Sequence, residues 1–286
     1  MQSDALAHEG QRPFILLARQ PASPPLPLED VFPAQLLRLA VEFFPRGALS
    51  PASNSRRVPL ERALERMRLP SPGATPYALL TVPPRRWRSL LTRLDAHEPH
   101  FVTQAHLRPE GECAAAVGPA NRSWQFEREL RWRIMALGGA VGTGTHLHQD
   151  RLPLASWHHQ VRGRKRWLLC RPGPSHEYCG GHVDGFAPDY SACPQFNLSS
   201  CEEHTLGPGE GLFFPERWWH QTLTLDAVTL SVSRSLLMPT ATRQFAAVMR
   251  SYCNEAIRVA PDVYARMCEA LQPCLLRLSA SGIESE

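Results

Sequence analysis

Short runs of β-forming residues alternate with glycine- and proline-containing turns from about residue 130 to residue 235. Examples are LRWRIMAL at 130–137, VRGRKRWLLCRP at 161–172 and HQTLTLDAVTLSVSR at 220–234. Strands this short, joined by turns rather than by long helical crossovers, pair in antiparallel sheets. The middle of the chain therefore predicts an antiparallel β-barrel or β-sandwich.

Helical and extended patterns precede this β region. Apolar residues at three- and four-residue spacing predict helices, and short apolar runs bounded by proline and glycine predict strands. The expected helices lie at 35–44, 60–67 and 84–96, and the expected strands at 13–19 and 75–82.

Two closing helices are expected at 245–257 and 264–278, where apolar residues again keep helical spacing. They would pack on the barrel or on a second copy of the chain, which indicates a homodimer. We accordingly expect an N-terminal strand and helical segment at 1–70, a β domain at 71–236 and a helical segment at 237–286.

Composition narrows the functional classes. Of 286 residues, 43% are hydrophobic and 20% charged, as in a folded protein, and a net charge of +4 does not by itself argue for nucleic acid. No apolar run reaches the roughly 18 residues of a membrane span, and the start lacks the features of a signal peptide. We therefore expect a cytosolic or nuclear protein that does not enter a membrane, with its eight cysteines as thiols or metal ligands rather than disulfides.

A metal site is predicted from His148, Asp150 and the distant His220. Residues i and i+2 of a strand point the same way, so one imidazole and one carboxylate can reach a common ion. A histidine from a facing strand would complete a 2-His-1-carboxylate triad, which leaves positions open on non-haem iron(II). The alternative is structural, with His148 capping a turn and Asp150 pairing with Arg151.

His146 offers a second assignment, because it would share a strand face with His148 and Asp150. A site built on His146 and His148 would resemble an ordinary cupin. The glutamate that such a site expects soon afterwards is missing, so we favour His148 and Asp150.

A histidine- and cysteine-rich stretch could hold a structural zinc as another metal site. A loop without zinc is the default interpretation, because the spacings fit no common zinc finger. The candidate zinc ligands are His176, Cys179, His182, Cys193, Cys201 and His204.

Over residues 75–235 the chain resembles the JmjC family of oxygenases, and within it the branch of arginine demethylases and lysyl hydroxylases related to the phosphatidylserine receptor. Two family patterns match: TxxHxD followed by Trp and GxKRW, and PGxxxFxPxxWWH followed by LxLD. The matching residues are Thr145, His148, Asp150, Trp157, Gly163, 165–167 and 208–226, with LRW at 130–132 and Pro-Tyr at 76–77 upstream.

The resemblance implies a double-stranded β-helix, the jelly-roll or cupin-like barrel, that uses iron(II), 2-oxoglutarate and dioxygen. Iron would bind to His148, Asp150 and His220, and Lys165 would hold the far carboxylate of 2-oxoglutarate. A buried carboxylate needs such a cation, and Lys165 is the only lysine in the chain. Hydroxyl groups would come from Tyr77, Thr145 and Ser231, for which ordinary strand packing is the alternative role.

Two positions depart from the family pattern. His158 and Ser233 replace asparagines that contact the cosubstrate or substrate in relatives.

The expected reaction is hydroxylation of a protein side chain with release of succinate and CO2. The alternatives are N-methyl demethylation, hydroxylation of tRNA, or an inactive JmjC-like module that binds a metal or a partner.

Overall fold

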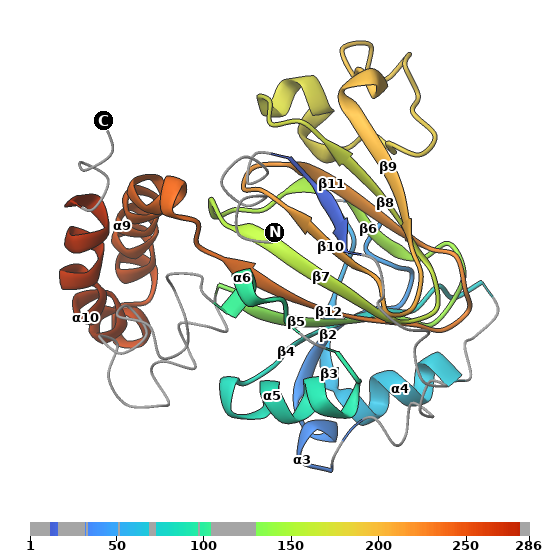
Figure 1. Cartoon of the computed structure of the whole chain (residues 1–286), viewed down its shortest axis with the longest axis horizontal. Coiled ribbons are helices and arrows are strands. Elements are labelled where there is room, and N and C mark those ends of the chain that lie inside the picture. Colours follow the sequence, from blue (N-terminus) through green and yellow to red (C-terminus); the bar gives the residue numbers. More distant parts are fainter. Residues whose placement is uncertain are drawn as a thin grey trace.

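Two antiparallel sheets form the centre of the computed structural model (Figure 1). The large sheet has the strand order β1-β10-β7-β12-β5-β4-β2-β3, and the small sheet has the order β6-β11-β8-β9. This is the cupin-like jelly roll expected from the sequence. The structure describes residues 12–16, 32, 34–50, 52–68, 73–96, 98–103 and 130–280.

From β5 onward the chain passes back and forth between the two sheets, with β8 and β9 both in the small one. The large sheet contains β1 Phe14–Leu16, β2 Ala40–Phe44, β3 Arg56–Pro59, β4 Tyr77–Thr81, β5 Arg133–Gly138, β7 Ala155–Arg162, β10 Gly211–Phe214 and β12 Thr229–Leu236. The small sheet contains β6 Gly144–Gln149, β8 Lys165–Cys170, β9 Cys201–Leu206 and β11 Trp219–Thr224.

Helices flank the sheets, and none of those described is long and apolar enough to cross a bilayer. The α-helices are α3 Ala34–Leu37, α4 Leu60–Arg68, α5 Pro84–Arg93, α6 His100–Thr103, α9 Thr242–Val259 and α10 Pro261–Ala280. The 3₁₀ helices are η1 Ser175–Gly181, η2 Leu198–Ser200 and η3 Pro239–Ala241.

The large sheet buries one face against helices and turns the other toward the small sheet. Leu80 and Met135 belong to an apolar cluster with Trp87 of α5, and α3, α4 and α5 lie along this outer face (Figure 1). Side chains alternate along a strand, so Tyr77 of β4 points to the opposite, inner face. Tyr77 and the other side chains on this inner face therefore lie between the two sheets.

The helix expected over 35–44 is wrong in its second half. Helix α3 ends at Leu37, and β2 begins at Ala40 and pairs with both β3 and β4. Val41 and Phe43 are fully buried while their neighbours are partly exposed, which is the alternation of a strand. The apolar residues of this segment fit both the helical and the strand periodicity, and pairing with β4 selects the strand.

The two closing helices are confirmed as α9 and α10, which pack against each other. Phe245 and Met249 of α9 and Leu271 of α10 share an apolar cluster with Leu152 and Leu237 near the sheets. The pair lies at one end of the large sheet (Figure 1). The homodimer expected from these helices stays a prediction.

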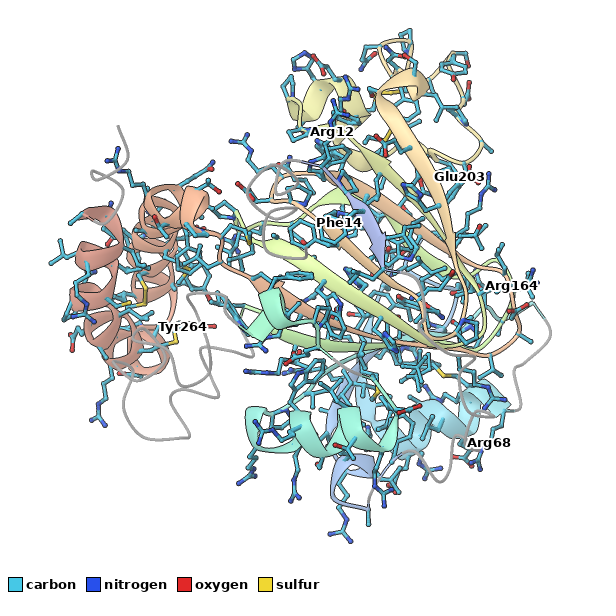
Figure 2. The ribbon with its side chains drawn as sticks, viewed as in Figure 1. Arg12, Phe14, Arg68, Arg164, Glu203 and Tyr264 are labelled. Atoms are coloured by element: carbon cyan, nitrogen blue, oxygen red, sulfur yellow. A yellow bond between two sulfur atoms is a disulfide. The ribbon has the colours of Figure 1, made fainter. Side chains whose placement is uncertain are left out.

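The expectation that the cysteines are thiols or metal ligands is wrong for the described residues, because every described cysteine is disulfide-bonded. One disulfide, Cys170–Cys201, joins β8 to β9, whose register sets the two residues opposite each other. Two more are Cys179–Cys193 and Cys253–Cys268, the second of these joining α9 to α10. Sulfur atoms appear in yellow in Figure 2. Strand register and helix packing, which sequence spacing does not reveal, create these pairs.

Removal of the disulfide between the closing helices tests this finding. The Cys253→Ser, Cys268→Ser double variant should lose about 2–4 kcal/mol in the free energy of unfolding, because the cross-link no longer restricts the unfolded chain. Urea denaturation without reductant measures the loss, and Ser251→Ala, an exposed change on α9, is the control. Alkylation of Cys253 and Cys268 in wild-type protein denatured without reductant would contradict the pairing.

Candidate metal centre

Two strands of the small sheet bring the predicted metal ligands together. In the register of β6 and β11, His148 lies directly opposite His220, and Asp150 follows the end of β6. Their candidate ligand atoms all lie within 4.8 Å of one another. Within the described part of the chain, no other group of three histidine, cysteine or acidic side chains meets in this way.

Both imidazoles are held in one orientation by main-chain carbonyls. Nδ1 of His148 lies 2.8 Å from the carbonyl oxygen of His146, and Nδ1 of His220 lies 3.0 Å from that of Trp218. A carbonyl oxygen only accepts, so each Nδ1 carries the hydrogen and donates it. Each Nε2 therefore keeps a lone pair, which is the tautomer that a metal-binding histidine needs.

The electrostatic environment keeps His148 neutral. Desolvation lowers the pKa of His148 to about 4, the positive charge of His220 adds to this effect, and Asp150 opposes it. A smaller contribution that also lowers this pKa comes from Arg131. Because only the neutral imidazole binds a metal, His148 is ready to act as a ligand at physiological pH.

The donor set fits an iron(II) ion. Two imidazole nitrogens and one carboxylate are the ligands of the non-haem iron triad, which occupies one face of an octahedron. The tautomers of His148 and His220, each with a lone pair on Nε2, also suit the binding of an iron(II) ion. That iron binds there stays a prediction.

His146 does not join the group. Its ring centroid lies 5.2 Å from that of His148, and its Nδ1 donates to the carbonyl oxygen of Ala48 at 3.1 Å. The geometry thus combines His148 with Asp150 and His220, and it does not assemble a site from His146 and His148.

Lys165 lies inside the protein, and no carboxylate of the described residues lies beside it. It is 2% exposed, and its ammonium group donates to Oγ of Ser231 at 2.9 Å and lies 5.7 Å from the centre of the Tyr77 ring. Burial lowers the pKa of Lys165 to about 8, and no charge of a described acidic residue offsets that. A buried ammonium group of this kind is suited to bind an anionic ligand.

Two of the three predicted hydroxyl groups, those of Thr145 and Tyr77, converge on Thr222, which the sequence argument missed. Oγ1 of Thr222 lies 2.9 Å from Oγ1 of Thr145 and accepts a hydrogen bond from the Thr145 main-chain N–H. Tyr77 hydrogen bonds to the same side chain, although burial, the larger effect, raises the pKa of Tyr77. The position of Thr222, two residues after His220 in a strand, is a signal that could have identified it.

His158 and Ser233 lie opposite each other on β7 and β12. The His158 ring packs against Trp167 and Phe214, with centroid distances of 4.5 and 5.4 Å, and its buried Nε2 has no hydrogen-bond partner in the described structure. Desolvation lowers the pKa of His158, and the charges of His220 and Lys165 add to this. His158 is therefore close to both the triad and the buried lysine.

The disulfides contradict the structural zinc site considered for this stretch. Cys179 is bonded to Cys193, and Cys201 to Cys170, so these sulfur atoms are not thiolates that could hold an ion. The nearby histidines form no metal-binding group in the described residues. Disulfides, rather than zinc, secure the segment between β8 and β9.

Comparison with known proteins agrees with this fold. The model of the family described as "Cupin-like domain" matches residues 54–234. HSPB1-associated protein 1 of Homo sapiens is 31% identical over 106 residues, which are 33% of this chain and 22% of the relative. Lysine-specific demethylase 8 of Xenopus tropicalis is 33% identical over 109 residues, 35% of this chain and 24% of the relative.

A third relative is the bifunctional arginine demethylase and lysyl-hydroxylase psr-1 of Caenorhabditis briggsae. It is 28% identical over 122 residues, 37% of this chain and 29% of the relative. The matched segment thus spans less than a third of the length of each of these three relatives.

Loss of any triad ligand should weaken iron binding. In His148→Ala, Asp150→Ala and His220→Ala, affinity for iron(II) should fall more than about tenfold, because even outer-shell changes at metal sites cost about 10- to 100-fold. Anaerobic equilibrium dialysis measures the affinity. His146→Ala is the matched control and should retain iron; loss of iron in His146→Ala together with its retention in His148→Ala would reverse the assignment.

Proposed function

This chain belongs to the cupin-like domain family and has a domain of the JmjC oxygenase type, and we propose that it is an iron(II)- and 2-oxoglutarate-dependent dioxygenase that hydroxylates a protein side chain. The observation that carries the proposal is the combination of the triad with the buried Lys165. The triad is suited to hold iron, and the buried ammonium group of Lys165 lies between the same two sheets. Together they suit a cosubstrate that carries two carboxylates.

Lys165 supports 2-oxoglutarate as that cosubstrate. Burying an ammonium group costs free energy that a hydrogen bond to one serine does not recover. A carboxylate would supply the missing charge, with Ser231 as a second donor, and charge-assisted hydrogen bonds of this kind are strong. Nearby Tyr77 and Thr222 provide further hydroxyl groups.

Each part of the site has a distinct role in the proposed reaction. His148, Asp150 and His220 would hold the iron from one side, and Lys165 would orient the cosubstrate. When bound, iron and 2-oxoglutarate would supply the oxidation of a C–H bond by dioxygen, with release of succinate and CO2. The aromatic rings of Trp167 and Phe214, which are buried around His158, would keep water from the site.

A protein substrate is favoured by the names of the relatives, which include a lysyl-hydroxylase and demethylases. Removal of an N-methyl group uses the same oxidation at a methyl carbon, so N-methyl demethylation is the nearest alternative. Hydroxylation of tRNA is a further one. The cellular location stays a prediction: one reason for expecting the cytosol or nucleus, cysteines as thiols, does not hold, since disulfides are typical of oxidising compartments.

The competing function is a module that binds a metal or a partner without turnover. His158 and Ser233 motivate it, because both depart from the family pattern close to the site. The imidazole of His158 has an unpaired buried nitrogen, however, so it retains a polar group that a bound ligand can contact. Turnover decides between the two functions.

Succinate release tests the proposed reaction. Anaerobically purified protein supplied with iron(II), ascorbate, 2-oxoglutarate and oxygen should form succinate, and Asp150→Ala should not. In Lys165→Met, the KM for 2-oxoglutarate should rise about 10- to 100-fold, because a hydrogen bond between charged groups is lost. Arg88→Gln, an exposed change on α5, is the control. Wild-type succinate no higher than that of Asp150→Ala, with candidate peptides present, would favour the binding module.

The affinity for 2-oxoglutarate should depend on pH through Lys165. The lysine pKa is lowered to about 8, so the ammonium form dominates below that pH and is lost above it. The dissociation constant should thus be flat at lower pH and rise by up to about tenfold per unit above pH 8. Isothermal titration calorimetry with manganese(II) in place of iron measures it. The rise should disappear in Lys165→Met, and a wild-type value constant to about pH 9.5 would contradict this role.

A further inference from the structure

A pocket of about 170 Å³ opens over β2, β4 and β5, apart from the residues assigned to metal and cosubstrate. Its floor is formed by Leu79, Thr81 and Ile134, and charged groups stand at its rim. Those rim residues are Glu42, Arg57 and Arg131. The combination of an apolar floor with a charged rim is typical of a site that receives one part of a ligand and orients the rest.

The pocket lies on the same face of the large sheet as the candidate site. Leu79 and Thr81 follow Tyr77 at intervals of two, so all three point to the inner face of β4. Tyr77 reaches Thr222 in the small sheet, whereas Leu80 belongs to the cluster with the outer helices.

Strand pairing connects the pocket floor to the metal centre. Ser233 of β12 pairs with Ile134 on one side and with His158 on the other. His158 is close to His220 and Lys165. The floor of the pocket is therefore two strands away from His158, which is a suitable position for a peptide group next to the target.

The rim of the pocket is positively charged. Arg131 donates two hydrogen bonds to Glu42, at 2.9 and 3.1 Å, so the carboxylate is neutralised by one guanidinium group. Arg57 lies opposite Glu42 in the register of β2 and β3, is exposed, and forms no ion pair or hydrogen bond with another described residue. One carboxylate against two guanidinium groups leaves a net charge of +1 and one unpaired arginine.

The backbone at Arg131 supports a role for this rim. Arg131 has a φ of 49°, in the left-handed region that is unfavourable for residues with a Cβ atom. Such conformations persist where the surrounding structure holds them, and they are frequent at binding sites.

We propose that this pocket receives a side chain that neighbours the target in an acidic peptide segment, with Arg57 binding a carboxylate of the same segment. The inference rests on the proposed oxygenase function and adds the class of substrate. The volume favours a single side chain over a nucleotide, since pockets that enclose drug-sized ligands measure roughly 300–1,000 Å³. The positive rim favours acidic over basic flanking residues.

Peptide binding to the full chain tests the proposal. Three fluorescein-labelled peptide pools of equal length, each with a randomised central residue, would carry glutamate, serine or lysine at the flanking positions. Fluorescence anisotropy at low and high salt measures their dissociation constants. A single-stranded RNA of similar charge is the fourth probe. The variants are Arg57→Gln and its matched control Arg88→Gln, on α5 at the opposite face of the sheet.

The glutamate pool should bind about three- to fivefold more tightly than the serine pool, the size expected for one exposed ion pair. The preference should shrink at high salt and disappear in Arg57→Gln, while Arg88→Gln should retain it. Equal binding of the pools, tighter binding of the lysine pool or of RNA, or a preference that survives Arg57→Gln would overturn the proposal.

Failure of this inference can be separated from failure of the proposed function. Binding of the peptide pools needs no turnover, and succinate release can be measured without any peptide. Succinate release without a glutamate preference would remove the substrate class and leave the oxygenase. A glutamate preference without succinate release would leave an acidic-peptide site on an inactive module.

Discussion

The pairing of β6 with β11 is the constraint on which the candidate site depends. Their register sets His148 opposite His220, although some seventy residues separate the two in the chain. The same strands supply the carbonyl oxygens, of His146 and Trp218, that fix the tautomer of each imidazole. A shift of this register by one residue would turn one imidazole to the outer face, so sheet pairing and metal binding are a single structural requirement.

The outer face of the small sheet explains why the cysteine-rich segment matters to the site. Leu147 and Trp219, the neighbours of the two histidines, point outward into an apolar cluster with Tyr178, Val183 and other residues of that segment. Tyr178 stacks on Trp219 with a centroid distance of 4.7 Å. The disulfides Cys170–Cys201 and Cys179–Cys193 hold this cover in place. This segment therefore packs on the outer face of the strands that carry the metal ligands and stabilises them.

The sequence predicted those features that depend on local pattern or on the family motifs. The β region and the closing helices follow from periodicity, the convergence of His148, Asp150 and His220 follows from the resemblance of the motifs, and the structure shows all three. Other features that depend on pairing between distant segments did not follow. Ala40–Phe44 became a strand because β4 lies beside it, and the cysteines became disulfides because β8 and β9, and α9 and α10, bring them together. Thr222 was missed because its partners come from β4 and β6.

The most direct test of the central claim is a crystal structure of the full chain grown without oxygen in the presence of manganese(II) and 2-oxoglutarate. The account predicts an anomalous manganese peak bonded to Nε2 of His148, a carboxylate oxygen of Asp150 and Nε2 of His220, with a 2-oxoglutarate carboxylate on Lys165. A manganese peak bonded to other residues, or a cosubstrate with no contact to Lys165, would contradict it.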